Sequence, residues 1–362
     1  TNSGNINTNG GATALAAGDR VSLDISGDGL LNVSVDAAAA GASINQTGAI
    51  IADGGKVFIT AKSADALMDT VLNVGGLVRA RSLSEQNGVI RLDGGDAGVV
   101  SVTGTLDASG RQSGQTGGTV AVLGDKVGLF DGARIDASGD AGGGTVLVGG
   151  NYQGNGPERN ASMAYMAAGA GIDASASGNG DGGTVVVWSD EATRVHGDIS
   201  VRGGANGGNG GLVETSSHGY LEVTRAPDLS AALGQGGLWL LDPSDLTILD
   251  GVGDGANPEN TTGAGTLADP FLSATGASVI YWTTINTALA SGNVKVTTVG
   301  SPADGTETGN ITVSEAGVLT GANNLSLDAA GDLLINASIT HNGVSAGNLG
   351  GSLVFQAGGN IS

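Results

Sequence analysis

The sequence predicts an all-β chain folded as a parallel β-helix, with roughly three short strands per coil and small inserts outside the coils. One observation is a repeat: residues 106–110 (Leu-Asp-Ala-Ser-Gly) return at 135–139 as Ile-Asp-Ala-Ser-Gly, each copy followed by a Gly-Gly pair, at 117 and 143. The period is about 26 to 29 residues, with one longer stride of about 37 to 39. The second observation is that apolar residues alternate with polar ones, which is typical of strands.

The strands within a repeat are four or five residues long and are bounded by turn-forming Gly, Asn, Asp or Ser. Successive coils should stack about 4.8 Å apart, with Leu106 beside Ile135 and Val120 beside Val146. About 13 or 14 such coils would fit the chain length. An antiparallel sandwich of many short strands is the alternative, but the conserved order of phrases from copy to copy favours the β-helix.

The composition limits the function. The chain has 362 residues, 68 of them Gly, no Cys, and a formal net charge of -21. This acidity argues against nucleic-acid binding, which needs a basic face. No apolar run approaches the ~18 residues of a membrane span, and the chain reads as a piece of a longer protein.

The pattern divides the chain into three parts. Residues 1–249 form a β-helix segment whose first coils include the alternating runs 21–25 and 31–35, with inserts near 63–72 and 151–169. The first insert should hold a short helical turn. Residues 250–284 should be an irregular excursion, and 285–362 should continue the β-helix. A short helix is expected at 283–289, with Thr283 or Thr284 as its N-cap.

The insert at 151–169 is the candidate ligand-contact loop, because loops on a rigid scaffold usually carry recognition. Its candidate contact residues are Tyr152, Arg159 and Tyr165. The alternative, given equal weight, is that Tyr165 and Met166 only fill a corner of the rod.

The sequence predicts no catalytic residues, no cofactor and no metal site. Asp107, Asp136 and Asp173 recur one coil apart and could act as acid and base. Turn aspartates that bind the local backbone are the favoured interpretation, because a catalytic pair would not recur at every coil. Arg79, Arg81 and Arg91 could form a basic patch, but pairing with neighbouring carboxylates is favoured. The histidines, His196, His218 and His341, should be solvated surface residues.

Several phrases resemble the filamentous-haemagglutinin-like large exoproteins, the secreted TpsA-type partners of two-partner secretion systems. They stand at 27–36 (Gly-Asp-Gly-Leu-Leu-Asn-Val-Ser-Val-Asp), 48–57 (Gly-Ala-Ile-Ile-Ala-Asp-Gly-Gly-Lys-Val), 71–80, 149–154, 172–175, 187–190 and 237–243 (Gly-Leu-Trp-Leu-Leu-Asp-Pro). The resemblance implies a right-handed β-helix exported through an outer-membrane β-barrel transporter. It places the protein outside the bacterial cell, secreted or on its surface. It also implies that no more than the final coils of the secretion domain are present.

These observations predict a non-enzymatic segment of a rod-like surface adhesin for cell–cell, biofilm-matrix or host attachment, with a polysaccharide or cell-surface ligand. Two alternatives remain. The first is a carbohydrate-active β-helix enzyme, which would present exposed aromatic residues along a groove. The second is a passive stalk for a distal toxin.

Overall fold

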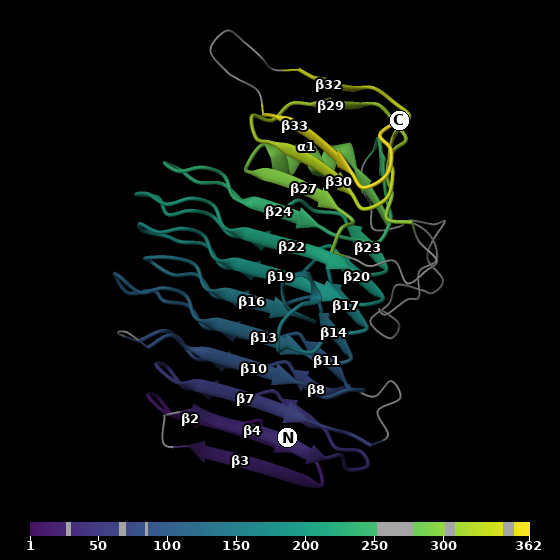
Figure 1. The fold of residues 1–362 in the computed structure, drawn as a ribbon. Helices are drawn as coiled ribbons and strands as arrows, with labels where there is room; N and C mark the ends of the chain where they lie inside the picture. The colour runs from purple at the N-terminus through teal and green to yellow at the C-terminus, as the bar shows by residue number, and fades with distance from the viewer. Residues whose placement is uncertain (27–29, 65–69, 84–85, 252–277, 301–307, 343–350) are drawn as a thin grey trace.

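The computed structural model describes residues 1–362 apart from 27–29, 65–69, 84–85, 252–277, 301–307 and 343–350, and it is a parallel β-helix (Figure 1). Three parallel sheets run along the rod, and the strands of successive coils lie side by side in each. As far as residue 200, the chain passes from sheet to sheet and returns to the first after one coil, as the repeat predicts. The fold class is therefore confirmed.

Sheet 1 has seven strands, β1 (Asn5–Asn7), β6 (Ala49–Ile51), β9 (Leu77–Arg79), β12 (Thr105–Asp107), β15 (Arg134–Asp136), β18 (Gly171–Asp173) and β21 (Asp198–Ser200). Sheet 2 has eleven, β2 (Ala12–Ala17), β7 (Lys56–Ala61), β10 (Val89–Asp93), β13 (Thr119–Leu123), β16 (Thr145–Val148), β19 (Thr184–Ser189), β22 (Leu212–Ser217), β24 (Leu238–Leu241), β27 (Asn293–Thr297), β30 (Leu325–Ala329) and β33 (Leu353–Ala357).

Sheet 3 also has eleven strands, in the order β5 (Ile44–Gln46), β8 (Thr70–Val74), β11 (Val99–Val102), β14 (Lys126–Leu129), β17 (Met163–Met166), β20 (Ala192–Val195), β23 (Tyr220–Val223), β26 (Ser278–Tyr281), β25 (Leu246–Leu249), β28 (Ile311–Val313) and β31 (Leu333–Ile335). With eleven strands in each long sheet, the described rod has fewer coils than the 13 or 14 expected. The reason is that a hairpin, an insert and a helix take up residues outside the three sheets.

The core is a set of ladders of like residues. Leu106 pairs with Ile135 and Val120 with Val146, as predicted. The inward residues of every sheet form one continuous buried cluster along the rod. One coil cannot bury its apolar row alone, so each coil is stabilised by its neighbours.

The Gly-Gly pairs have a steric reason. A Cβ atom on Gly117 would lie 1.8 Å from the carbonyl oxygen of Ala137, and one on Gly143 would lie 1.8 Å from that of Ala174. At these corners the backbone of one coil packs directly on the next coil, and no side chain fits between them.

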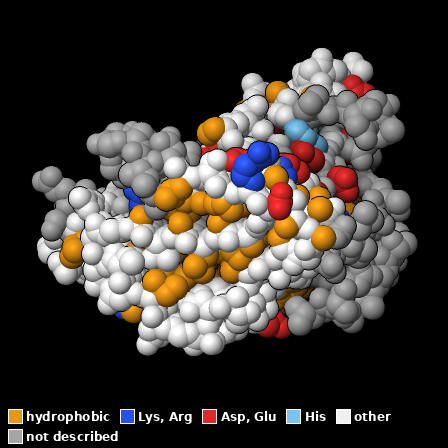
Figure 2. Space-filling model, turned by 90° about the horizontal axis from the view of Figure 1, so that it is seen from below, with side chains coloured by type: hydrophobic (Ala, Val, Ile, Leu, Met, Phe, Trp, Pro, Cys, Tyr) orange, Lys and Arg blue, Asp and Glu red, His pale blue; other side chains and the backbone are white. Residues whose placement is uncertain are grey.

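The first departure from the predicted pattern is an antiparallel hairpin, β3 (Arg20–Ser26) with β4 (Leu30–Ala37). The runs 21–25 and 31–35 therefore pair with each other outside the three sheets, and their assignment to the first coils is wrong. Alternation with period two predicts a strand but does not distinguish parallel from antiparallel pairing. The hairpin lies at the N-terminal end of the rod, where Figure 2 shows bands of hydrophobic side chains; Val21 and Leu23 are 44% and 53% exposed.

The insert expected near 63–72 ends earlier than that, because strand β8 of sheet 3 begins at Thr70. The predicted helical turn falls on residues 65–69, outside the described part of the chain. In the range 250–284, regular structure resumes at strand β26, and residues 252–277 are likewise outside the described part.

The helix predicted at 283–289 is present as α1 (Trp282–Leu289). Its N-cap is Tyr281, whose side chain makes no capping hydrogen bond, so the prediction of Thr283 or Thr284 is wrong. Both threonines lie in the first turn, and Trp282, 2% exposed, starts the helix by packing into the core. Beyond it, β29 (Gly317–Leu319) and β32 (Ile339–His341) form a short parallel pair near the C-terminal end (Figure 1).

Candidate functional site

The predicted insert divides into a strap and a piece of the wall. Residues 149–162, here called the strap, leave sheet 2 after β16 and contain a short 3-10 turn, η1 (Tyr152–Gly154). The chain then rejoins the wall as β17, which pairs in register with β14 and β20. The insert is therefore shorter than the range 151–169 suggested.

The structure does not bring the three candidate contact residues together. Tyr152 is on η1 and is 41% exposed. Arg159 is held by the wall, with an ion pair to Asp96 and a 3.4 Å contact to Asp93. Tyr165 is a wall residue of β17, half-buried between the rings of Phe130 at 5.7 Å and His196 at 5.9 Å. Of the three, Tyr152 has the most accessible side chain.

The corner-filling alternative holds for Met166, which is fully buried in the main core. Tyr165 is next to it on the strand and so points to the outer face of the wall.

The strap lies over a second apolar cluster on the outer face of sheet 2. This outer cluster consists of Ala121, Leu123, Leu147, Val186 and Trp188, all buried although they alternate with the inward residues of their strands. A Cβ on Gly154 would lie 2.6 Å from the Trp188 ring, so the strap backbone rests directly on the indole. The strap therefore covers what would otherwise be an exposed hydrophobic patch.

The strap is anchored by two buried carboxyl groups. The backbone N–H of Gln153 donates to both carboxylate oxygens of Glu214, at 3.1 and 3.0 Å. Its side-chain Nε2 donates to Asp242 at 3.2 Å. Both acids are 0% exposed, so these bonds are made in a desolvated site, where leaving a polar group without its hydrogen bond is costly.

Burial also changes the acidity of this pair. It raises the pKa of Glu214 to about 7 and that of Asp242 to about 6, and the proximity of the two carboxyl groups adds to the rise for Glu214. Raised values suit a general acid, but neither group has an exposed surface that a substrate could reach. The geometry favours an anchor for the strap.

Glu214 and Asp242 were not predicted as site residues, although the sequence holds a signal for Glu214. Glu214 occupies the outward position that holds Leu147 and Val186 on the two preceding strands of sheet 2. An acid in place of an aliphatic residue at one position of a ladder indicates that a hydrogen-bond donor lies beside it in the folded chain. The partner is Gln153, 61 residues earlier in the chain, and sequence spacing does not reveal it.

The histidines are not the solvated residues expected. His196 is half-buried beside Thr224, at 3.1 Å, and burial lowers its pKa to about 4. His218 packs its ring edge-on against Trp188 at 4.9 Å and contacts Asp190 at 3.3 Å. His341 lies 3.0 Å from the carbonyl oxygen of Gly321.

The recurring aspartates are turn residues, which is the interpretation that the sequence favoured over an acid and base pair. Asp107 accepts hydrogen bonds from the backbone N–H and the hydroxyl of Ser109 at 3.1 and 2.6 Å, and Asp136 does the same with Ser138 at 3.0 and 2.6 Å. Asp173 accepts from the backbone N–H of Ser175 at 2.9 Å. The motif Asp-Ala-Ser thus closes the same turn in successive coils.

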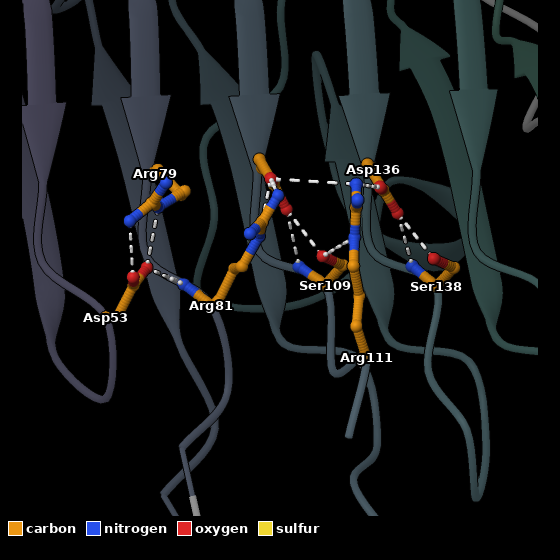
Figure 3. A network of polar contacts seen from close by, with 8 residues as sticks. Asp53, Arg79, Arg81, Ser109, Arg111, Asp136 and Ser138 are labelled. Atoms are coloured by element: carbon orange, nitrogen blue, oxygen red, sulfur yellow. Dashed lines mark hydrogen bonds and ion pairs between the residues drawn. The ribbon is translucent and has the colours of Figure 1, made fainter. Parts of the chain in front are cut away.

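Arginines link these turns from one coil to the next (Figure 3). Arg79 pairs with Asp53 at 2.7 Å, Arg81 with Asp107 at 2.6 Å, and Arg111 with Asp136 at 2.8 Å. Burial raises the pKa of Asp107, but bonds from Arg81 and Ser109 outweigh it and leave that pKa below its ordinary value. Arg79 and Arg81 are therefore engaged within the rod, and Arg91 lies 3.7 Å from Asp93, so pairing describes all three better than a free basic patch.

A groove of about 750 Å³ follows the outer face of sheet 1 across the strands β12 to β21. Its charged lining includes Arg134, Asp136, Asp173, Asp198, Arg202 and Asp228. Arg134 donates to the carbonyl oxygens of Ala133 and Gly169, at 2.7 and 2.6 Å, and has no carboxylate partner among the described residues.

The described part of the chain shows no cluster of three or more His, Asp or Glu side chains arranged for a metal ion. Among the same residues, no helix has the length and apolar character to cross a membrane.

No known protein family and no curated protein matches the sequence. Among solved structures, the chain is similar to the HMW1 secretion domain from Haemophilus influenzae, at 29% identity and a TM-score of 0.51. The match is to a secretion domain. It covers 66% of this chain and 59% of that one, so the similarity spans less than two thirds of the HMW1 domain.

Proposed function

We propose that this chain is a segment of an exported, rod-like exoprotein of the two-partner secretion type, and that its rod presents an adhesive surface outside the cell. The observation that carries the proposal is the similarity to the HMW1 secretion domain, which extends over 66% of the chain and accompanies the same parallel β-helix that the repeats predict. We further propose an outer-membrane β-barrel transporter as the export partner. Cells that lack this transporter should retain the protein.

The groove on sheet 1 is the surface that best suits a polar polymer such as a polysaccharide. It runs along the rod and is lined by both guanidinium donors and carboxylate acceptors, which together can bind sugar hydroxyls. Tyr152 on the strap offers the other candidate contact, an aromatic ring 41% exposed.

A binding screen of the purified segment against immobilised polysaccharides and whole cells tests the adhesive role. We expect the wild-type segment to bind and Arg134→Ala to weaken binding at least tenfold. Loss with Tyr152→Ala in place of Arg134→Ala would move the site to the strap. The exposed Arg20→Ala, on the hairpin, is the matched control and should bind as the wild type does.

Two outcomes would refute the adhesive role. If no polymer or cell binds the wild-type segment, the rod is a passive stalk. If the segment depolymerises a polysaccharide, it is a carbohydrate-active enzyme, and the carboxylates that line the groove become the first residues to replace.

A further inference from the structure

The strap joins coils that are far apart in the sequence. Towards the N-terminal end, Arg159 pairs with Asp96, which lies 63 residues earlier. Towards the C-terminal end, Gln153 reaches Glu214 and Asp242, 61 and 89 residues later. The outer cluster lies between these two attachments. Docking of the strap therefore depends on these end contacts, on the bond from Asn160 to Asp190 at 3.1 Å, and on packing against Trp188.

The two attachments differ in their solvent exposure. Asp96 is largely exposed, with 65% of its side chain accessible, so solvent screens its ion pair with Arg159. The attachment at Gln153 is made to two carboxyl groups that are fully buried. Its stability therefore depends on the charge that those groups carry.

The docked strap also holds a strained residue. Gln153 has φ 53° and ψ 34°, the left-handed region, and it is the one non-glycine residue with positive φ in the described part of the chain. Such a conformation persists only when surrounding contacts hold it. These contacts include the bonds from Gln153 itself to Glu214 and Asp242, so opening the strap lets the backbone relax.

We propose that the strap is a pH-dependent cover: it is docked when Glu214 and Asp242 are protonated and is released when both ionise, exposing the outer cluster that includes Trp188. This device is independent of the proposed adhesive role, because it requires no ligand.

The direction of the pH dependence follows from the burial of the two acids. A carboxyl group whose pKa is raised in the docked state favours docking at low pH, and this contribution is lost as the pH rises through the raised value. For Asp242 and Glu214 the values are about 6 and about 7. The N–H of Gln153 favours the ionised form of Glu214, but burial outweighs this bond. Above pH 7 two neighbouring negative charges remain without water, and opening the strap hydrates them.

The other charged and titratable groups around the pair come from three elements. Tyr152 of η1 lies close enough to both acids for their charges to raise its pKa further, beyond the effect of burial. Lys295 of β27 attracts Asp242 but is already paired with Asp328 at 2.9 Å. His218, beside Asp190, follows β22 and also faces Asp242. His218 is the group whose own titration must be separated from that of the carboxyl pair.

Hydrogen exchange of the full 362-residue chain, followed by mass spectrometry of peptides from 149–162, measures strap opening. After correction for intrinsic exchange rates, we expect protection of the strap to be about tenfold lower at pH 8 than at pH 6. Peptides from β12 and β15 should keep constant protection, because these strands lie in sheet 1 and contain none of these acids. A strap with constant protection over this range would overturn the proposal without any variant.

Two variants identify which groups cause the pH dependence of strap protection. Glu214→Gln with Asp242→Asn should abolish the pH dependence, because neither amide ionises. His218→Gln should retain it. If the double variant retains the wild-type profile, or if His218→Gln loses it, the carboxyl pair is not the switch.

Discussion

Val146→Asp tests the assignment of the inward face of the rod. Val146 is fully buried and pairs with Val120 on one side and Val185 on the other. Burial of a valine contributes about 1.5 kcal/mol or more. An aspartate with an ordinary pKa of about 3.9 must stay protonated in the wall, which costs about 4 kcal/mol at pH 7. The variant should therefore lose about 5 kcal/mol, and in any case more than ~3 kcal/mol, of the free energy of unfolding.

Thr145→Asp is the matched control, because Thr145 precedes Val146 on β16 and faces outward, half-exposed, between Thr119 and Thr184. It should lose less than ~1 kcal/mol. Thermal and urea unfolding followed by circular dichroism at pH 7 measures both. At pH 4 the deficit of Val146→Asp should shrink, because about half of the unfolded chains then carry a protonated carboxyl and neutralising it costs little. Wild-type melting of Val146→Asp, or a larger loss for Thr145→Asp, would show that the faces are assigned the wrong way round.

Three further predictions use the same unfolding assays. Gly143→Ala should lose more than ~2 kcal/mol, because its Cβ would lie 1.8 Å from a carbonyl oxygen of the next coil, whereas Gly171→Ala, whose closest neighbour would be 3.6 Å away, should melt like the wild type. Asp107→Ala should lose about 2 kcal/mol at pH 7, and the difference from wild type should vanish as the pH falls through the lowered pKa of this group; a constant difference would exclude its ion pair as the cause. Trp188→Ala should lose about 3 kcal/mol and raise hydrogen exchange in the strap, and unchanged exchange there would mean that the indole does not hold the strap.

The sequence predicted the parts of the fold that repeat. Leu106, Val120 and their counterparts one coil later carry both a period and an alternation, and these together determine the register of a stacked coil. The hairpin of β3 and β4 was missed because its alternation is the same as that of a coil strand. What distinguishes it is its partner strand, which local alternation does not specify.

The candidate site was predicted in part. The interruption of the repeat located the strap, and the composition of the strap drew attention to Tyr152 and Arg159. Their surroundings could not be predicted, because Asp96 and Glu214 each lie two coils away from the strap and no periodic signal connects them to it. Tyr165 was misassigned to a loop. It is an aromatic residue at an outward position of a strand, and the sequence does not distinguish this from a loop position until the strand register is known.

The strap also has a consequence for the order in which this chain folds. Most contacts in the rod join residues about one coil apart, so a growing end can add one coil at a time, using the previous coil as a template. The strap does not follow this rule, since Gln153 meets Asp242 only after 89 further residues are in place. Until β24 has formed, the strap has its anchor at Asp96 but not the one at Asp242. Its closure is therefore a late step, and it marks the moment at which the coils from β10 to β24 are complete.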